Sequence, residues 1–300
     1  MRTASICLAI AEIFLIACSS KKEDESYHID LGAGLEQFDV KLSGPKPGEW
    51  LYEHKEPGQS FEQYKVSDPV SPDDKRRKIY IQPLGTFSPI EDSIVNYTAG
   101  YLTIFFGLET AIAPAINDSI IPAHARRMRE EGNEQLLTKY ILNTLLPNRI
   151  PEDAIVVMAV TAKDLYPSDD WNYVFGQATI KKRVGVSSIY RLSIPDMDSM
   201  TYPLCLERLI KTSSHEIGHM FSIQHCTHAV CIMNGSNSLW ESDSRPNRLC
   251  SDCLKKLAWN LEFSVEDRFK DLTFFFRKHK LKTDQRLASR DFAVVRKKIN

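Results

Sequence analysis

Residues 215–253 constrain this chain more than any other stretch, because they carry two sets of side chains with metal-ligand spacing. The stretch opens with the pattern HExxH, in which His215 and His219 are four residues apart. On a helix this spacing puts both imidazoles on one face, and Glu216, about 100° further round, can reach a water on the same ion. This is the geometry of a hydrolytic zinc site. The alternative is an exposed helix with two unrelated histidines, because such short matches also arise by chance.

A third histidine, His225, follows His219 by six residues. On a continuing helix its side chain would lie about 240° away, so a three-histidine site requires the backbone to turn near 222 or 223. In the pattern HExxHxxGxxH a glycine makes this turn, whereas here the position is Ser222. A left-handed serine costs about 1–2 kcal/mol. We therefore expect either a left-handed Ser222 or a helix that ends by a different route.

The second set consists of two cysteine pairs with knuckle-like spacing: Cys226-x4-Cys231 and Cys250-x2-Cys253. Four thiolates at this spacing suit a closed, tetrahedral structural zinc, and two disulfides are the alternative if the compartment is oxidising. Because His225 directly precedes the first cysteine, a metal-bound thiolate cluster would hold this histidine rigidly. Met233 follows two residues after the first pair, and would pack beneath the three imidazoles or be an ordinary core methionine.

Taken together, the pattern HExxHxxxxxHC-x4-C-x-M followed by CxxC resembles the archaemetzincins, a branch of the metzincin clan of zinc metallopeptidases. The likeness runs over roughly residues 45–270 and includes 47–51, 61–64 and 171–178; Ser222 is a departure from it. The resemblance implies a Met-turn at Met233 and peptide or protein substrates, with cleavage from the N-terminus as one reaction it allows. It also implies that a strand just before the catalytic helix pairs with an extended substrate at the rim of the cleft.

The order of elements before residue 215 predicts one α+β domain over 45–276: a twisted mixed sheet, two long helices behind it, and a metal-organised helical C-terminal part. Strands are expected at 78–84, 110–121, 153–160, 175–180 and 184–192, and helices at 90–106, 133–146, 205–221, 254–261 and from Ser264. Residues 277–300 are a basic tail, read as a solvated helical face or as a contact for anionic lipid. Cys205 is expected to be a buried, unpaired thiol.

The first residues read as a targeting segment. Residues 1–17 combine a positive start with an apolar run, and the box that ends at Cys18 resembles a bacterial lipoprotein signal, in which that cysteine becomes the lipid-modified N-terminus. An ordinary secretory signal is the alternative. Residues 18–44 are expected to be a flexible tether. This predicts an extracytoplasmic protein, anchored to a bacterial membrane through Cys18.

These features lead to two hypotheses of function. In the first, His215, His219 and His225 bind a catalytic zinc, the four cysteines bind a structural zinc, and Glu216 activates water against a peptide bond. In the second, suggested by Ser222, the chain is a lipid-anchored binding or scaffold protein of the same fold with weakened catalysis. The net charge of −1 indicates no nucleic-acid partner, and we expect a monomer.

Overall fold

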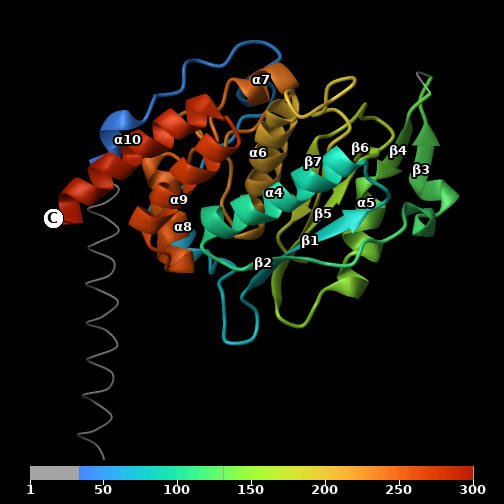
Figure 1. Ribbon diagram of the computed structural model, residues 1–300, viewed down its shortest axis with the longest axis horizontal. Coiled ribbons are helices and arrows are strands. Elements are labelled where there is room, and N and C mark those ends of the chain that lie inside the picture. Colours follow the sequence, from blue (N-terminus) through green and yellow to red (C-terminus); the bar gives the residue numbers. More distant parts are fainter. Residues whose placement is uncertain (1–33, 131, 300) are drawn as a thin grey trace, which may run out of the picture.

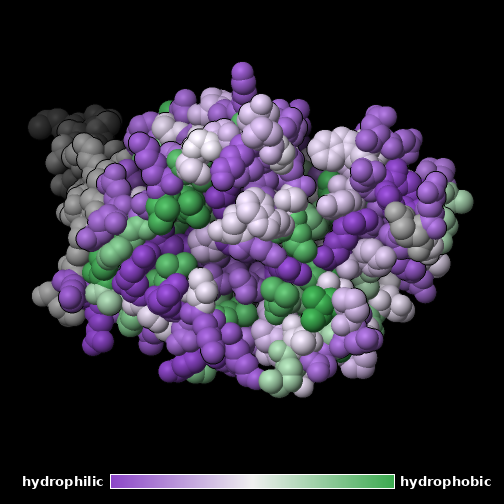
Figure 2. All heavy atoms as spheres, turned by 90° about the horizontal axis from the view of Figure 1, so that it is seen from above, coloured by the Kyte–Doolittle hydropathy of each residue, from purple (hydrophilic) through white to green (hydrophobic). Residues whose placement is uncertain are grey.

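The computed structural model describes residues 34–130 and 132–299, and the side chains only as far as 297. The predicted signal peptide, Cys18 and most of the tether therefore lie outside the described residues. No helix in the described part of the chain is long and apolar enough to cross a membrane. On the face shown in Figure 2, hydrophobic side chains form small groups among hydrophilic ones.

A five-stranded sheet forms the centre of the described chain. Its strand order is β2 (Thr110–Ile112), β1 (Lys78–Leu84), β5 (Ala154–Thr161), β8 (Val184–Ser188) and β7 (Gly176–Thr179). The first four are parallel, and β7 is an antiparallel edge strand paired with β8. All eight residues of β5 are buried, as its continuous apolar run predicts. The expected strands at 78–84 and 153–160 are thus confirmed.

Two long helices cover one face of this sheet, α4 (Pro89–Phe106) and α6 (Tyr202–Met220), which confirm the helices expected at 90–106 and 205–221 (Figure 1). Ser88 begins α4 with a capping box, and Gly107 ends it in the left-handed conformation, at φ 65°. Helix α6 carries the HExxH pattern in its last two turns, and Cys205 in its first turns is a buried free thiol, as expected.

The other face of the sheet is covered by residues for which our prediction was right only in part. A helix was expected over 133–146, and residues 138–145 are helical, as α5 (Thr138–Tyr140) and the π-helical segment η4 (Ile141–Leu145), but the residues before them form strand β4 (Glu134–Leu137). β4 lies in a small second sheet between β3 (Arg126–Met128) and β6 (Asp164–Tyr166). The apolar positions have helical spacing, but tertiary pairing of β4 with both neighbours decides its structure.

The C-terminal part is helical, and its last three helices gather at the end of the molecule away from the small sheet (Figure 1). It consists of α7 (Leu239–Asp243), α8 (Ser251–Leu261), α9 (Val265–Lys278) and α10 (Lys282–Ile299). The predicted basic tail is mostly α10, which packs along α9 and buries Val295. Its basic residues lie mainly on the outer face, as expected of an amphipathic helix.

The segment before the main sheet also lies on the domain. It includes the short helices α2 (Trp50–Glu53) and α3 (Phe61–Val66). Leu35 is 1% exposed, and Asp39 forms an ion pair with Arg248. The described end of the predicted tether is therefore docked rather than flexible, because it carries an apolar and a charged side chain that both find partners.

Candidate active site

The three histidines of the predicted metal site meet at one point. His215 and His219 lie one turn apart on α6, and their Nε2 atoms are 3.0 Å apart. The possible ligand atoms of these two residues and of His225 all lie within 4.8 Å of one another. Burial is the main cause that lowers the pKa of His219 to about 4 and lowers the pKa of His215 as well. Both imidazoles are therefore neutral at pH 7, the form that binds metals.

Ser222 makes the turn that brings His225 to the other two. Its φ is +68°, in the left-handed region, so the first of the two expected geometries is confirmed. The amide of Ser222 donates to the carbonyl of His219 and that of Ile223 to the carbonyl of Gly218, at 2.8 and 3.1 Å, which is the Schellman end of a helix. The Oγ atom of Ser222 accepts a hydrogen bond from the amide of Val70, 3.2 Å away. This bond offsets part of the cost of a left-handed serine.

The outer nitrogen of each imidazole has an acceptor beside it. Nδ1 of His215 lies 2.8 Å from the carbonyl of Ile232, and Nδ1 of His219 lies 2.7 Å from that of Ile223. Since a carbonyl only accepts hydrogen bonds, both Nδ1 atoms carry the proton, and both Nε2 atoms point lone pairs at each other. Two acceptors 3.0 Å apart repel unless a cation lies between them, so this arrangement fits a metal ion.

Glu56 is the acceptor for the third imidazole, and sequence analysis did not find it. Both of its carboxylate oxygens lie 2.9 Å from Nδ1 of His225. The ring of Trp50 packs edge-on against the same imidazole, with centroids 5.1 Å apart. The segment before the main sheet therefore supports the third histidine from the other side of the cleft. Glu56 and His225 are 169 residues apart, so their contact produces no local pattern in the sequence.

Glu216 faces the cleft between α6 and the edge strand β7. A Cβ atom on Gly176 of β7 would lie 3.0 Å from Cγ of Glu216 and 2.9 Å from Cγ2 of Thr212, so the strand passes directly over the carboxylate. Burial raises the pKa of Glu216 to about 8. A carboxylate in such surroundings is a stronger base than one in water, as proton transfer near neutral pH requires.

Met233 lies directly under the helix that bears the histidines. It is 1% exposed, and a Cβ atom added to Gly218 would lie 2.6 Å from its sulfur. Gly218 occupies the turn between His215 and His219, so close contact with Met233 requires a residue without a side chain there. Met233 thus packs in the core against the active-site helix, and its place beneath the imidazoles stays a prediction.

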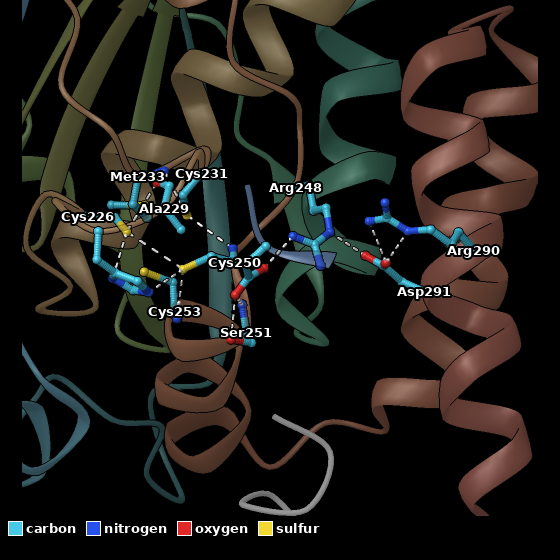
Figure 3. Close-up of polar contacts among 12 residues, drawn as sticks. Cys226, Ala229, Cys231, Met233, Arg248, Cys250, Ser251, Cys253, Arg290 and Asp291 are labelled. Carbon is cyan, nitrogen blue, oxygen red and sulfur yellow. Dashed lines mark hydrogen bonds and ion pairs between the residues drawn. The ribbon is translucent and has the colours of Figure 1, made fainter. Parts of the chain in front are cut away.

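The four cysteines form the second cluster, with their thiols turned toward one another (Figure 3). All are buried and free, and Sγ of Cys226 is 3.7 Å from Sγ of Cys250. A disulfide needs about 2.05 Å, whereas thiolates at about 2.3 Å from one tetrahedral ion are roughly 3.8 Å apart. The amides of Met233 and Cys250 lie 3.5 and 3.3 Å from Sγ of Cys231, and donate to it. The cluster therefore fits a structural metal ion better than two disulfides.

Arg248 ties this cluster to both ends of the described chain. It lies two residues before Cys250 and forms ion pairs with Asp39 and with Asp291 on α10 (Figure 3). Asp39 also accepts hydrogen bonds from the amide and hydroxyl of Ser251, at the start of α8. Three segments far apart in the sequence thus converge beside the thiols.

A cleft of about 500 Å³ lies over the three histidines and Glu216. One wall is the edge strand β7 with the residues before it, among them Tyr173 and Phe175, and the other includes Trp50 and the segment from Ile232 to Arg245. This volume suits a few residues of an extended peptide, and the unpaired side of β7 offers main-chain hydrogen bonds to it.

Comparison with known proteins agrees with this geometry. The family model described as Peptidase family M54 matches residues 126–259. Archaemetzincin-2 of Homo sapiens and that of Macaca fascicularis are each 35% identical to this chain over 268 residues, which cover 77% of this chain and 74% of theirs. The chain belongs to the archaemetzincin family. It is a zinc metallopeptidase.

Two solved archaemetzincins are similar to this chain over nearly their whole length. The crystal structure of archaemetzincin from Archaeoglobus fulgidus, complexed with malonate, is 32% identical and covers 60% of this chain and 99% of its own, with a TM-score of 0.48. The archaemetzincin from Methanopyrus kandleri is 28% identical and covers 64% of this chain and 99% of its own, with a TM-score of 0.49.

Proposed function

We propose that this archaemetzincin hydrolyses peptide bonds with water that Glu216 deprotonates. His215, His219 and His225 would hold the catalytic zinc, which when bound supplies a Lewis acid that polarises the peptide carbonyl and makes nearby water more acidic. One observation carries the proposal: the Nε2 atoms of His215 and His219 point their lone pairs at each other, 3.0 Å apart, in the cleft that Glu216 also lines.

The remaining steps belong to side chains and main chain of the protein. An extended substrate would pair with β7, so that its scissile bond lies over α6. A carboxylate oxygen of Glu216 takes the proton of the attacking water and then returns it to the amine that leaves. The edge strand and Trp50 reduce the access of bulk water to this proton. Cys226, Cys231, Cys250 and Cys253 would hold a second, structural zinc that anchors His225 from the next residue.

Ser222 had suggested the second hypothesis, a binding or scaffold protein with weakened catalysis. Its left-handed turn and the position of His225 support the catalytic hypothesis instead. Cleavage from the N-terminus would require a group that receives a free amino group. Among the described residues that line the cleft, Glu216 is the one carboxylate, and it is assigned to the water. We therefore propose cleavage without a requirement for a free N-terminus.

A fluorogenic peptide library tests this function. Each peptide is supplied with a free and with an acetylated N-terminus, and the soluble domain is assayed as purified, after chelation and after zinc is restored. We expect hydrolysis that chelation removes and zinc restores, with acetylated peptides cleaved at least as well as free ones. Absence of hydrolysis by the zinc-loaded protein would favour the scaffold hypothesis, and loss of activity on acetylation would support an aminopeptidase.

From the sequence alone we also propose a lipid-anchored, extracytoplasmic protein that acts as a monomer. The support is the box ending at Cys18 and the fact that a single chain supplies every residue of both clusters.

A further inference from the structure

Arg245 lines the cleft, and no side chain or carbonyl of the described residues forms a hydrogen bond with its guanidinium. Among the described residues its charged partner is Glu241, where Nη2 and Oε1 are 3.9 Å apart, beyond hydrogen-bond distance. Its Nε atom is buried and has no acceptor within the described part of the chain. The side chain is 19% exposed. A buried N–H without an acceptor is costly, and the guanidinium carries four further N–H donors in the same plane.

Glu241 is not a hydrogen-bond acceptor for Arg245, because its carboxylate accepts from other groups. Its two oxygens lie 3.1 and 3.2 Å from the amide of Trp50, and one of them accepts from the amide of Asn237 at 2.8 Å. These bonds fasten the segment after Met233 to α2. The carboxylate therefore shapes the wall of the cleft and leaves the guanidinium available to a ligand.

Lys211 adds a second positive charge to the same cleft. It lies one turn before His215 on α6, so its side chain leaves the helix in line with the two histidines. It is 4% exposed, and its Nζ donates to the carbonyl of Ser242, 3.0 Å away, which leaves two of its three N–H groups. The carboxylates of Glu207, Asp243 and Asp284 and the guanidinium of Arg208 also face it. Arg245 is therefore the principal group, and Lys211 supports it.

The charged side chains that line the cleft are mostly cationic. Among the described residues that line it, three side chains are cationic and one is a carboxylate: Lys139, Lys211, Arg245 and Glu216. We propose that Arg245, supported by Lys211, forms a subsite that binds a carboxylate of the substrate close to the scissile bond. A planar carboxylate matches the fork of a guanidinium with two parallel hydrogen bonds, and the partly buried cleft strengthens the pairing. The proposal rests on the peptidase function proposed above and names its substrate class.

Two parts of a peptide carry such a carboxylate: an Asp or Glu side chain, and the C-terminus. The first arm of the test compares peptides with Glu or Gln at each position around the scissile bond. The second arm compares each peptide as the free acid and as the C-terminal amide. We expect kcat/KM to be higher for the charged member of one pair by at least about tenfold.

Variants connect that preference to Arg245. Arg245→Gln should bring the preferred ratio close to one, and Arg245→Glu should reverse it in favour of a Lys at the same position. Arg245→Lys keeps the charge without the fork and should retain part of the preference. Lys270→Gln is the matched control, because Lys270 is an exposed cation on α9 outside the cleft, and its ratio should equal that of the parent. Thermal melting shows whether each variant folds.

Binding gives a second measurement that does not depend on turnover. Fluorescently labelled peptides of both arms are titrated into zinc-loaded Glu216→Gln, with and without Arg245→Gln. Tighter binding of the charged peptide that is lost with Arg245 supports the subsite even if hydrolysis is slow. Hydrolysis by the parent with no preference in either arm overturns the subsite and leaves the peptidase in place. No hydrolysis of any peptide overturns the peptidase, and the binding comparison then still decides the subsite.

Discussion

The carboxylate of Glu56 lies 2.9 Å from Nδ1 of His225, through both of its oxygens. A carboxylate in this position fixes the orientation of a ligating imidazole and makes its other nitrogen a better donor to a metal. The third histidine of the site is thus held by a residue from the segment that precedes the sheet.

Removal of Glu56 should therefore weaken the catalytic zinc. We expect Glu56→Ala to lower zinc affinity or kcat/KM by about 10- to 100-fold, and Glu56→Gln, which keeps an oxygen but loses the charge, to fall between. A competition titration with a chromogenic chelator measures the affinity. Glu62→Ala is the control, because Glu62 is exposed and pairs with Lys65 one turn away on α3. Parental zinc affinity in Glu56→Ala would remove Glu56 from the site.

Glu216→Gln should keep the fold and zinc but lose at least about 100-fold in hydrolysis, since an amide cannot take the proton of water. Gln has nearly the same volume, so the contact with Gly176 of β7 is preserved. Single-turnover assays with metal content measured on the same samples make the comparison. Undiminished turnover in this variant would assign the base to another residue.

Ser222 lets the cost of the turn be measured. Ser222→Gly removes the left-handed strain but also the hydrogen bond to Val70, and these changes of about 1 kcal/mol each nearly cancel. Ser222→Ala keeps the strain and loses the bond, so it should be less stable than Ser222→Gly by about 1–2 kcal/mol. Urea unfolding of the zinc-loaded variants measures the difference. Equal stability of the two variants would contradict a left-handed residue at 222.

Two zinc ions per chain are expected by elemental analysis. Cys253→Ser should lower the count to one and reduce the midpoint of thermal unfolding, because the structural ion contributes directly to folding. Cys205→Ser serves as the control: this thiol is buried and free, lies outside the cluster, and its loss should leave two ions. One zinc in the parent, with Cys226 or Cys250 in a disulfide by non-reducing mass spectrometry, would refute the second site.

Cys18→Ser should release the protein from the membrane fraction if that cysteine is lipid-modified, because stable anchoring needs more than one acyl chain and this residue would carry them. Cys7→Ser, a change within the predicted leader, should leave the protein in washed membranes. Retention of Cys18→Ser in the membrane fraction would point to the basic face of α10 or to an uncleaved leader.

Sequence reasoning identified the side chains of both clusters because their spacing is local. The need for His225 to reach an ion beside His219 predicted a turn near 222 or 223, and the φ of +68° at Ser222 decides between the two geometries that were expected. The same reasoning failed in the first part of 133–146. There the spacing of Leu136, Leu137 and Ile141 indicates a helix, but β4 forms because β3 and β6 lie on either side of it.

Residues that act across the chain were missed for a related reason. Glu56 and Arg245 are ordinary charged residues in their own neighbourhoods, and only the folded chain places one beside His225 and the other in the cleft. Long-range pairs of this kind carry no periodic signal, whereas helix caps such as Ser264 do and were found.

The segment before the sheet supports the turn at Ser222. The two are synthesised at different times, which determines when the site can be complete. The hydroxyl of Tyr64 donates to the carbonyl of Phe221, and the amide of Val70 to Ser222, across 157 and 152 residues. A ribosome adds about 5–20 residues per second. The segment that supports the turn is therefore synthesised roughly 10–30 s before the histidines. The cysteine cluster closes only at Cys253, later still. A chain that has not yet reached Cys253 therefore lacks part of the cluster beside His225, so the support of the third histidine becomes complete only when synthesis is almost finished.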